Sequence, residues 1–160
     1  MPAPLVAITS KPLDAIALAA AVSEDGAGLG AVTTFVGLVR DHNVGRRVLF
    51  LEYEAYDAMA LSVMQVILNE AAEHWPGIRL GMHHRTGRLE IGEASIIITA
   101  ASAHRADAFA ACRYAIERAK QILPVWKHEH FEGGDVWLEG AAVHPEDADA
   151  RQKAHGIACA

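Results

Sequence analysis

Apolar residues recur along this chain with two periods, which separate strand-like from helix-like segments. Short runs rich in Val, Ile, Leu and Phe alternate with longer stretches in which apolar residues return every three or four positions. Strands are predicted at 5–9, 30–36, 48–54, 78–84, 94–101, 125–131 and 136–139. Helices are predicted at 10–22, 57–75 and 102–120.

The length of the chain suits a single domain that spans residues 1–160. The helix over 57–75 stops at Pro76-Gly77 and carries apolar core positions without candidate chemistry. The run 94–101 is apolar throughout and bounded by polar residues, which predicts a strand buried on both faces. Alanines and charged residues dominate 140–160, and we expect a flexible tail there.

The end of the helix at Lys120, just before Pro124, organises the rest of the interpretation. Ile116, Cys112 and Phe109 precede Lys120 at the spacing of one helix face, so this lysine falls on an apolar stripe. Its stem can cover apolar surface while the amine reaches water near the negative end of the helix dipole. Alternatively, the amine is partly buried and has a lowered pKa that suits chemistry.

The composition of the chain limits the possible binding partners and the cellular compartment of the protein. The chain has 160 residues, 52% of them hydrophobic, and a formal net charge of −6. Such a charge argues against a nucleic-acid binder that neutralises phosphates. The sequence has neither an apolar run long enough to cross a membrane nor a signal-peptide pattern at its start. The spacing of Cys112 and Cys159 suggests neither a disulfide framework nor a zinc site, so a cytoplasmic location is expected.

Five basic side chains stand out at the ends of predicted elements, and together they form a candidate anion pocket. They are Arg40, His104, Arg105, Lys120 and Lys127. A strand end can aim a guanidinium at an anion, and the first turn of a helix offers free N–H groups.

Their neighbours leave alternatives open. Ser102 is a plausible N-cap of the helix, and Asp107 with solvent could simply compensate the two cations of its first turn. Arg46 and Arg47 are expected at a solvated hairpin tip. His83 and His84 are adjacent on a strand and point to opposite faces, so no metal site is expected there.

Geometry limits how the five basic residues can meet. Arg105 and Lys120 are 15 residues apart on one predicted helix, which separates them by roughly 22 Å. A single phosphate cannot touch both within one chain. Either the substrate is long or two chains of a symmetric dimer share the pocket, and we favour the dimer.

Other functional classes have weaker support. Ser102 and His104 could serve a hydrolase, but the chain has no Gly-x-Ser-x-Gly elbow and no evident third member. A phosphate-loop sequence is absent. A non-catalytic binding module fits the composition equally well, although it does not explain lysines on both sides of a helix stop.

Several motifs in order resemble the catalytic (large) subunit family of molybdopterin synthase. They are 37–43 (GLVRDHN), 102–105 (SAHR), Lys120, 124–129 (PVWKHE) and 134–137 (GDVW), within a match over about 30–139. Two positions depart from the family pattern. His128 stands where Lys or Arg is expected, and Gly140-Ala141 replace a basic residue that some relatives carry.

The resemblance implies a hammerhead-like α+β domain with a mixed or antiparallel sheet and a small additional antiparallel sheet. It implies a cytoplasmic homodimer within a heterotetramer, with a small ubiquitin-like sulfur-carrier subunit at each end. Sulfur would pass twice from the carrier's C-terminal Gly-Gly thiocarboxylate to cyclic pyranopterin monophosphate, without cofactor or metal. Lys120 and Lys127 would be catalytic, and the implied substrate contacts are Leu38, Val39, Arg40, His104, Arg105, Lys120, Lys127, His128 and Glu129. The competing interpretation is a scaffold that binds the carrier without catalysis.

Overall fold

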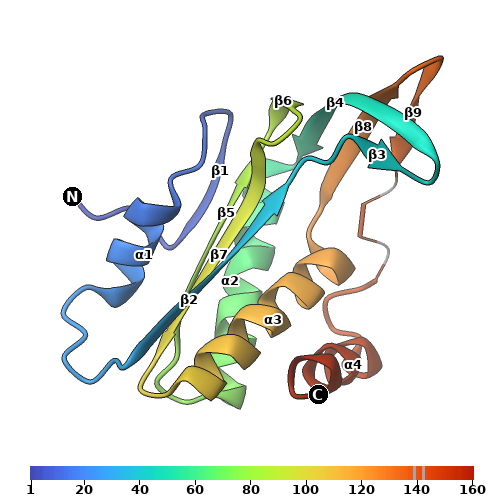
Figure 1. Cartoon of the computed structure of the whole chain (residues 1–160). Helices are drawn as coiled ribbons and strands as arrows, with labels where there is room; N and C mark the ends of the chain where they lie inside the picture. The colour runs from blue at the N-terminus through green and yellow to red at the C-terminus, as the bar shows by residue number, and fades with distance from the viewer. Residues whose placement is uncertain (139, 142) are drawn as a thin grey trace.

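The computed structural model describes residues 1–138, 140–141 and 143–160, and within them the chain forms two β-sheets flanked by helices (Figure 1). The strands are β1 (Val6–Thr9), β2 (Ala31–Leu38), β3 (His42–Asn43), β4 (Arg46–Ala55), β5 (Arg79–Arg85), β6 (Gly87–Glu90), β7 (Ala94–Ser102), β8 (Val125–Phe131) and β9 (Gly134–Leu138). The helices are α1 (Ala15–Ser23), α2 (Asp57–His74), α3 (Arg105–Ile122) and α4 (Ala148–Ala158). Among the described residues, no helix is both long and apolar enough to cross a membrane.

The first sheet has the order β1-β5-β7-β2 and is covered by helices on both faces (Figure 1). Strand β1 runs parallel to β5, whereas β5–β7 and β7–β2 are antiparallel. Ile97 of β7 packs with Leu18 of α1, while Ile96 and Ile98 join the core of α2 and α3 on the other face. This alternation explains why the run is apolar throughout and confirms the prediction of a doubly buried strand.

The second sheet is antiparallel and has the order β3-β4-β8-β9, with β6 also paired to β4. It begins where β2 leaves the first sheet, at a register shift between Gly37 and Leu38. A Cβ at Gly37 would lie 2.8 Å from Cγ2 of Ile96, so only glycine fits this close approach. The α+β fold, with one mixed sheet and an additional antiparallel sheet, is thus as expected, although the antiparallel sheet has five strands and the mixed sheet four.

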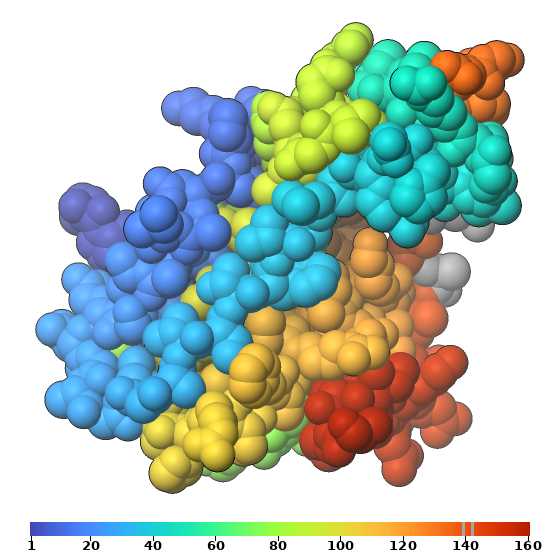
Figure 2. Space-filling model, viewed as in Figure 1, coloured from blue at the N-terminus to red at the C-terminus, as the bar shows by residue number. Residues whose placement is uncertain are grey.

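The C-terminal segment differs from the flexible tail that the sequence suggested over 140–160. Helix α4 lies against α3 (Figure 2), and Ala154 is fully buried between them. The small side chain permits a close approach of the two helices, which sequence composition alone does not reveal. The predicted strand over 136–139 reaches Glu139, and the tail includes Ala142, both of which lie outside the described residues.

A buried ion-pair network fastens this segment to the core. The Arg118 guanidinium is fully buried and donates to both carboxylate oxygens of Glu70, at 2.8 Å each. The Tyr114 hydroxyl donates to the same carboxylate at 2.8 Å, and Arg151 of α4 lies 3.2 Å from it. Arg118 also donates to the carbonyl of Pro145, so one side chain ties α2, α3 and the chain before α4 together.

Arg118→Ala is expected to lower the free energy of unfolding by about 3–5 kcal/mol, because it removes the fully buried, bidentate partner of the buried Glu70 carboxylate. Chemical denaturation of wild type and variant measures this change. Arg113→Ala is the matched control, since Arg113 forms an exposed ion pair with Glu117 at 2.8 Å on the same helix. The control should lose only about 0.5 kcal/mol, and equal losses in the two variants would contradict the assignment.

Candidate functional site

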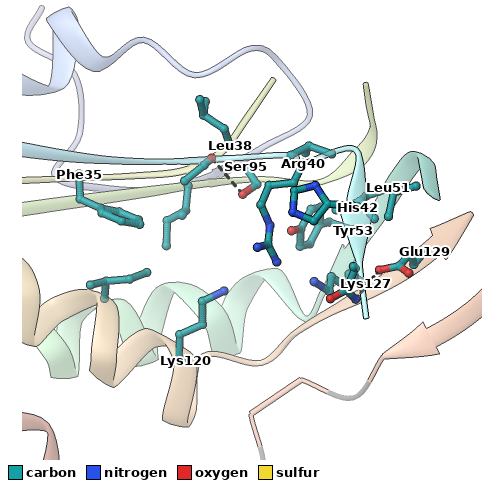
Figure 3. Close-up of a pocket in the computed structure, with 16 residues that line it drawn as sticks. Phe35, Leu38, Arg40, His42, Leu51, Tyr53, Ser95, Lys120, Lys127 and Glu129 are labelled. Atoms are coloured by element: carbon teal, nitrogen blue, oxygen red, sulfur yellow. Dashed lines mark hydrogen bonds between the residues drawn. The ribbon is translucent and has the colours of Figure 1, made fainter. Parts of the chain in front are cut away.

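A pocket of about 150 Å³ lies where β2, the β3–β4 hairpin, β8 and the end of α3 come together (Figure 3). Figure 2 shows segments of β2, the hairpin and α3 meeting on one face of the molecule. The wall of the pocket includes six of the nine predicted site residues: Leu38, Val39, Arg40, Lys120, Lys127 and Glu129. A second hollow of about 150 Å³ adjoins the first and shares Lys120, Lys127 and Tyr53 with it.

The two predicted catalytic lysines reach the pocket from different elements. Lys120 extends from the last turn of α3, and Lys127 from β8 beyond Pro124 (Figure 3). Lys127 is half-buried, and this desolvation lowers the pKa of its ammonium group. The charges of Lys120 and Arg40 lower that pKa further, while the Glu129 carboxylate acts in the opposite direction.

The exposure of Lys120 contradicts the interpretation that its amine is partly buried. Its side chain is exposed in the single chain, and the half-buried amine is that of Lys127. Helix α3 ends here with Lys120 at the pocket rim, so the stem leans on apolar residues such as Ile116 while the amine projects into the opening.

Glu129 forms a rigid part of the pocket wall. Its side chain is 1% exposed, and its carboxylate accepts hydrogen bonds from Asn43 at 2.8 Å and from Arg46 at 2.9 and 3.1 Å. Arg46 was expected at a solvated tip. Instead, the left-handed backbone of Val44 and Gly45 closes a tight turn that returns Arg46 toward β8.

The end of β2 presents the next three predicted residues. Val39 is buried, and its backbone exchanges hydrogen bonds with the segment before β7, through Glu93 at 3.0 Å and Gly92 at 2.8 Å. Leu38 and Arg40 on either side are exposed. Figure 3 shows the Arg40 guanidinium pointing toward Lys120 and Lys127, so this strand end aims a cation into the pocket.

His104 and Arg105 lie elsewhere in the single chain. They begin α3, whereas Lys120 is near its end, so the helical rise separates Arg105 from Lys120 by roughly 22 Å. Both side chains are exposed, and His104 lines a different hollow with Ser102 and Asp107. His104, rather than the expected Ser102, occupies the N-cap position, because β7 continues to Ser102.

His128 also lies outside the pocket of the single chain. Successive side chains of β8 alternate between faces, so Lys127 and Glu129 face the pocket while His128 faces outward. There its ring stacks on Trp137 with centroids 4.4 Å apart, and its Nε2 lies 2.6 Å from Asp135. His128 is also one of three residues, with Glu52 and His130, whose ligand atoms cluster on that outer face.

The histidine pair in β5 diverges as expected for strand neighbours. His83 contacts the carbonyl oxygen of Pro4, and His84 contacts that of Arg85. His84 lines the second hollow beside Lys120, and its ring forms a T-shaped pair with that of Tyr53, with centroids 5.0 Å apart. Burial lowers the pKa of the His84 imidazole to about 4, and the charge of Lys120 contributes to the decrease.

Sequence reasoning missed several lining residues whose types carry no special signal. Phe35, Tyr53 and Ser95 line the first pocket, as does Asn43. Tyr53 is opposite Lys127 in the β4–β8 register, so a strand-pairing prediction could have found it. The site as a whole offers three cations and a few hydroxyl groups on an apolar floor, which suits an anionic ligand and polarisation of its reacting atoms.

Comparisons with known proteins give a consistent result. A family model described as "MoaE protein" matches residues 8–122. The molybdopterin synthase catalytic subunit of Halalkalibacterium halodurans is 48% identical over 109 residues, which cover 68% of this chain and 70% of that protein. The crystal structure of molybdopterin synthase from Staphylococcus aureus matches with a TM-score of 0.78 and 38% identity, over 82% of this chain and 94% of that chain.

A more distant structure shares the fold. It is a protein–protein complex of subunits 1 and 2 of the molybdopterin-converting factor from Helicobacter pylori. The match has a TM-score of 0.72 at 22% identity and covers 90% of this chain and 98% of that chain.

The buried His84 predicts a specific pH dependence of stability. Its folded pKa of about 4 is below the ordinary value of 6.5, so the unfolded chain takes up the proton first as the pH falls. The fold therefore loses stability between about pH 6.5 and pH 4, and wild type should lose about 2 kcal/mol more than His84→Gln between pH 7 and pH 5. Denaturant titrations at the two pH values measure the difference. The exposed His144→Gln should behave like wild type, whereas parallel losses in wild type and His84→Gln would contradict the prediction.

Proposed function

The chain belongs to the MoaE protein family, and we propose that it acts as the catalytic subunit of molybdopterin synthase. The enzyme is then a sulfurtransferase of molybdenum cofactor biosynthesis. It transfers sulfur from the C-terminal thiocarboxylate of a small ubiquitin-like carrier to cyclic pyranopterin monophosphate, twice, to build the dithiolene of molybdopterin. The observation that carries the proposal is the convergence of Arg40, Lys120 and Lys127 on one pocket.

Charge supports this choice of substrates. The protein as a whole is acidic, with a formal net charge of −6, yet three cations meet at one place. Desolvation by burial, together with repulsion from Lys120 and Arg40, already lowers the pKa of Lys127. A phosphate and a thiocarboxylate are both anions, and each would relieve this repulsion on entering.

The two adjoining hollows suggest how the substrates divide the site. The first contains Arg40 and would hold the pterin phosphate. The second contains Gly140 and Ala141 on the side of the C-terminal segment, and it would admit the narrow Gly-Gly tail of the carrier. Lys120 and Lys127 line both hollows, so the thiocarboxylate would meet the pterin carbon between them.

Each transfer would form a bond from the thiocarboxylate sulfur to a carbon of the pterin substrate, while a carbon–oxygen bond of that carbon breaks and its oxygen substituent leaves. Water would then attack the carrier's carbonyl carbon and break its bond to sulfur, so that the carrier leaves as a carboxylate and the sulfur stays on the substrate as a thiolate. Lys120 would hold and polarise the thiocarboxylate or act as an acid–base group, and Lys127 would bind substrate and assist proton transfer. Glu129 would position Lys127 from its fixed place in β8, and Leu38 and Val39 would contact the substrate from the end of β2.

The proposal includes a homodimer within a heterotetramer with two carrier subunits. His104 and Arg105 would then reach the pocket of the partner chain and bind the phosphate with Arg40. Strand β2 supports this, because it is an edge strand whose Val32, Val36 and Leu38 are exposed. An exposed apolar edge of this kind is a ready surface for pairing with a second copy.

The proposal also keeps a cytoplasmic location, where the two free thiols of Cys112 and Cys159 would stay reduced. His128 would contact substrate only through a rearrangement or from outside the pocket, since its ring is stacked on Trp137 on the outer face.

Lys120→Ala is expected to reduce dithiolene formation by about 10²–10⁴-fold, because a positioned acid–base or charge-stabilising group is lost. The assay mixes the protein with thiocarboxylated carrier and cyclic pyranopterin monophosphate and detects product by mass spectrometry. Lys153→Ala, an exposed lysine of α4, is the matched control and should retain full activity. Near-normal turnover by a folded Lys120→Ala variant would show that Lys120 is not catalytic. A wild-type chain that binds the carrier and yields no dithiolene would favour the scaffold.

A mixing experiment tests the shared pocket. Arg105→Ala and Lys120→Ala should each impair activity as homodimers, since each disables both composite sites. After subunit exchange between the two variants, every mixed dimer has one site with both residues intact, and activity should recover. If activity does not recover although subunit exchange is demonstrated, all of the site lies in one chain. The same conclusion follows if light scattering finds a monomer that is fully active.

A further inference from the structure

The outer face of the second sheet carries a cluster of polar and aromatic side chains that lies outside the pocket of the proposed sulfur transfer. The register places Glu52 of β4 opposite His128 of β8, and His130 opposite Phe50. On the next strand, β9, Trp137 is opposite His128 and Asp135 is opposite His130. All of these side chains point away from the pocket, because Lys127 and Glu129 occupy the other face of β8.

Three members of the cluster converge on one point. A ligand atom from each of Glu52, His128 and His130 lies within 4.8 Å of the other two. The Nε2 atom of His130 is 2.7 Å from Glu52, and that of His128 is 2.6 Å from Asp135. The two imidazole side chains are mostly buried, with 25% and 16% exposed for His130 and His128, while the carboxylates are more open.

Aromatic neighbours fix the orientation of both imidazole rings. His128 stacks on Trp137, and His130 stacks on Phe50 with centroids 4.2 Å apart. The centroids of the two histidine rings are themselves 4.2 Å apart. The two histidines lie in β8, which is paired with β4 and β9, and each imidazole ring has an aromatic ring on either side. The imidazole nitrogen atoms therefore have little freedom to move apart.

We propose that Glu52, His128 and His130 form a binding site for a divalent transition-metal ion of the zinc class. Two imidazole nitrogens and a carboxylate oxygen are ligands that Zn²⁺ accepts, and three protein ligands leave a fourth position for water or a further carboxylate. Asp135 is already in contact with His128 and is suitably placed to serve as that carboxylate or as the outer partner that orients the ring.

The site is independent of the sulfur-transfer proposal, because all of its ligands come from one chain and lie on the face opposite the pocket. A bound ion would nevertheless link β4 to β8 directly behind Lys127 and Tyr53. It would therefore restrain the strand pair that forms the pocket wall. The inward face needs no change for the ion to bind.

Calorimetric titration of the full chain with zinc chloride tests the proposal. Wild type should bind one Zn²⁺ per chain saturably, and His130→Asn and Glu52→Gln should each weaken binding by more than about 10-fold, the lower end of the cost of losing even an outer-shell partner. Glu52→Gln keeps the shape of the side chain, so it tests the site even where the histidine variant folds poorly.

Two controls separate this cluster from the other possible ligands of the chain, which has nine histidines. His144→Asn removes an exposed histidine outside the cluster, and Cys159→Ser removes a thiol that lies 3.6 Å from His155. Both controls should bind zinc like wild type, and the near-ultraviolet spectrum of the Co²⁺-loaded protein should lack a thiolate charge-transfer band. Absence of saturable binding by wild type, or unchanged binding by either cluster variant, would overturn the proposal.

Discussion

The antiparallel pairing of β4 with β8 is the constraint on which the rest of the site depends. This register places Tyr53 opposite Lys127 and Leu51 opposite Glu129, all on the pocket side. The intervening residues, such as His128, are forced to the outer side. A slip of one residue would exchange the two faces and place the imidazole in the pocket and the amine outside. The ion pair of buried Glu129 with Arg46 links the β3–β4 hairpin to β8 and helps to fix this register.

Cations from three elements meet beside this strand pair: Arg40 follows β2, Lys120 ends α3 and Lys127 lies in β8. Arg40, Lys120 and Lys127 approach one another, and the lowered pKa of Lys127 reflects both its desolvation and its cationic neighbours. Glu129 offsets only part of this, since its carboxylate already accepts hydrogen bonds from Asn43 and Arg46. An anion in the pocket would be attracted by all three cations and would reduce the repulsion among them. The pocket therefore favours anionic ligands over neutral or cationic ones.

Much of this arrangement could be predicted from residue patterns, and the parts that could not have a common cause. Periodicity located the long helices and the strands of the first sheet, because each buries a face against the core. It missed the short strands β3 and β6, which lie in polar loops and exist only through their pairing with β4. The motifs identified the lysines, but the burial of Lys127 rather than Lys120 depends on long-range packing. The docking of α4 likewise depends on Glu70 and Arg118, which are distant in sequence.

The length of α3 sets the relation between the two groups of basic residues. With 18 residues, the helix is about 27 Å long at 1.5 Å per residue. One end carries His104 and Arg105 and the other carries Lys120, so a rigid element keeps two groups of basic residues apart. Within a closed two-fold dimer, the same separation acts twice, and each end can face the opposite end of the partner. In such a dimer, a helix too long for one phosphate would act as a spacer between two equivalent pockets, and the exposed edge of β2 would be the surface along which the two chains pair.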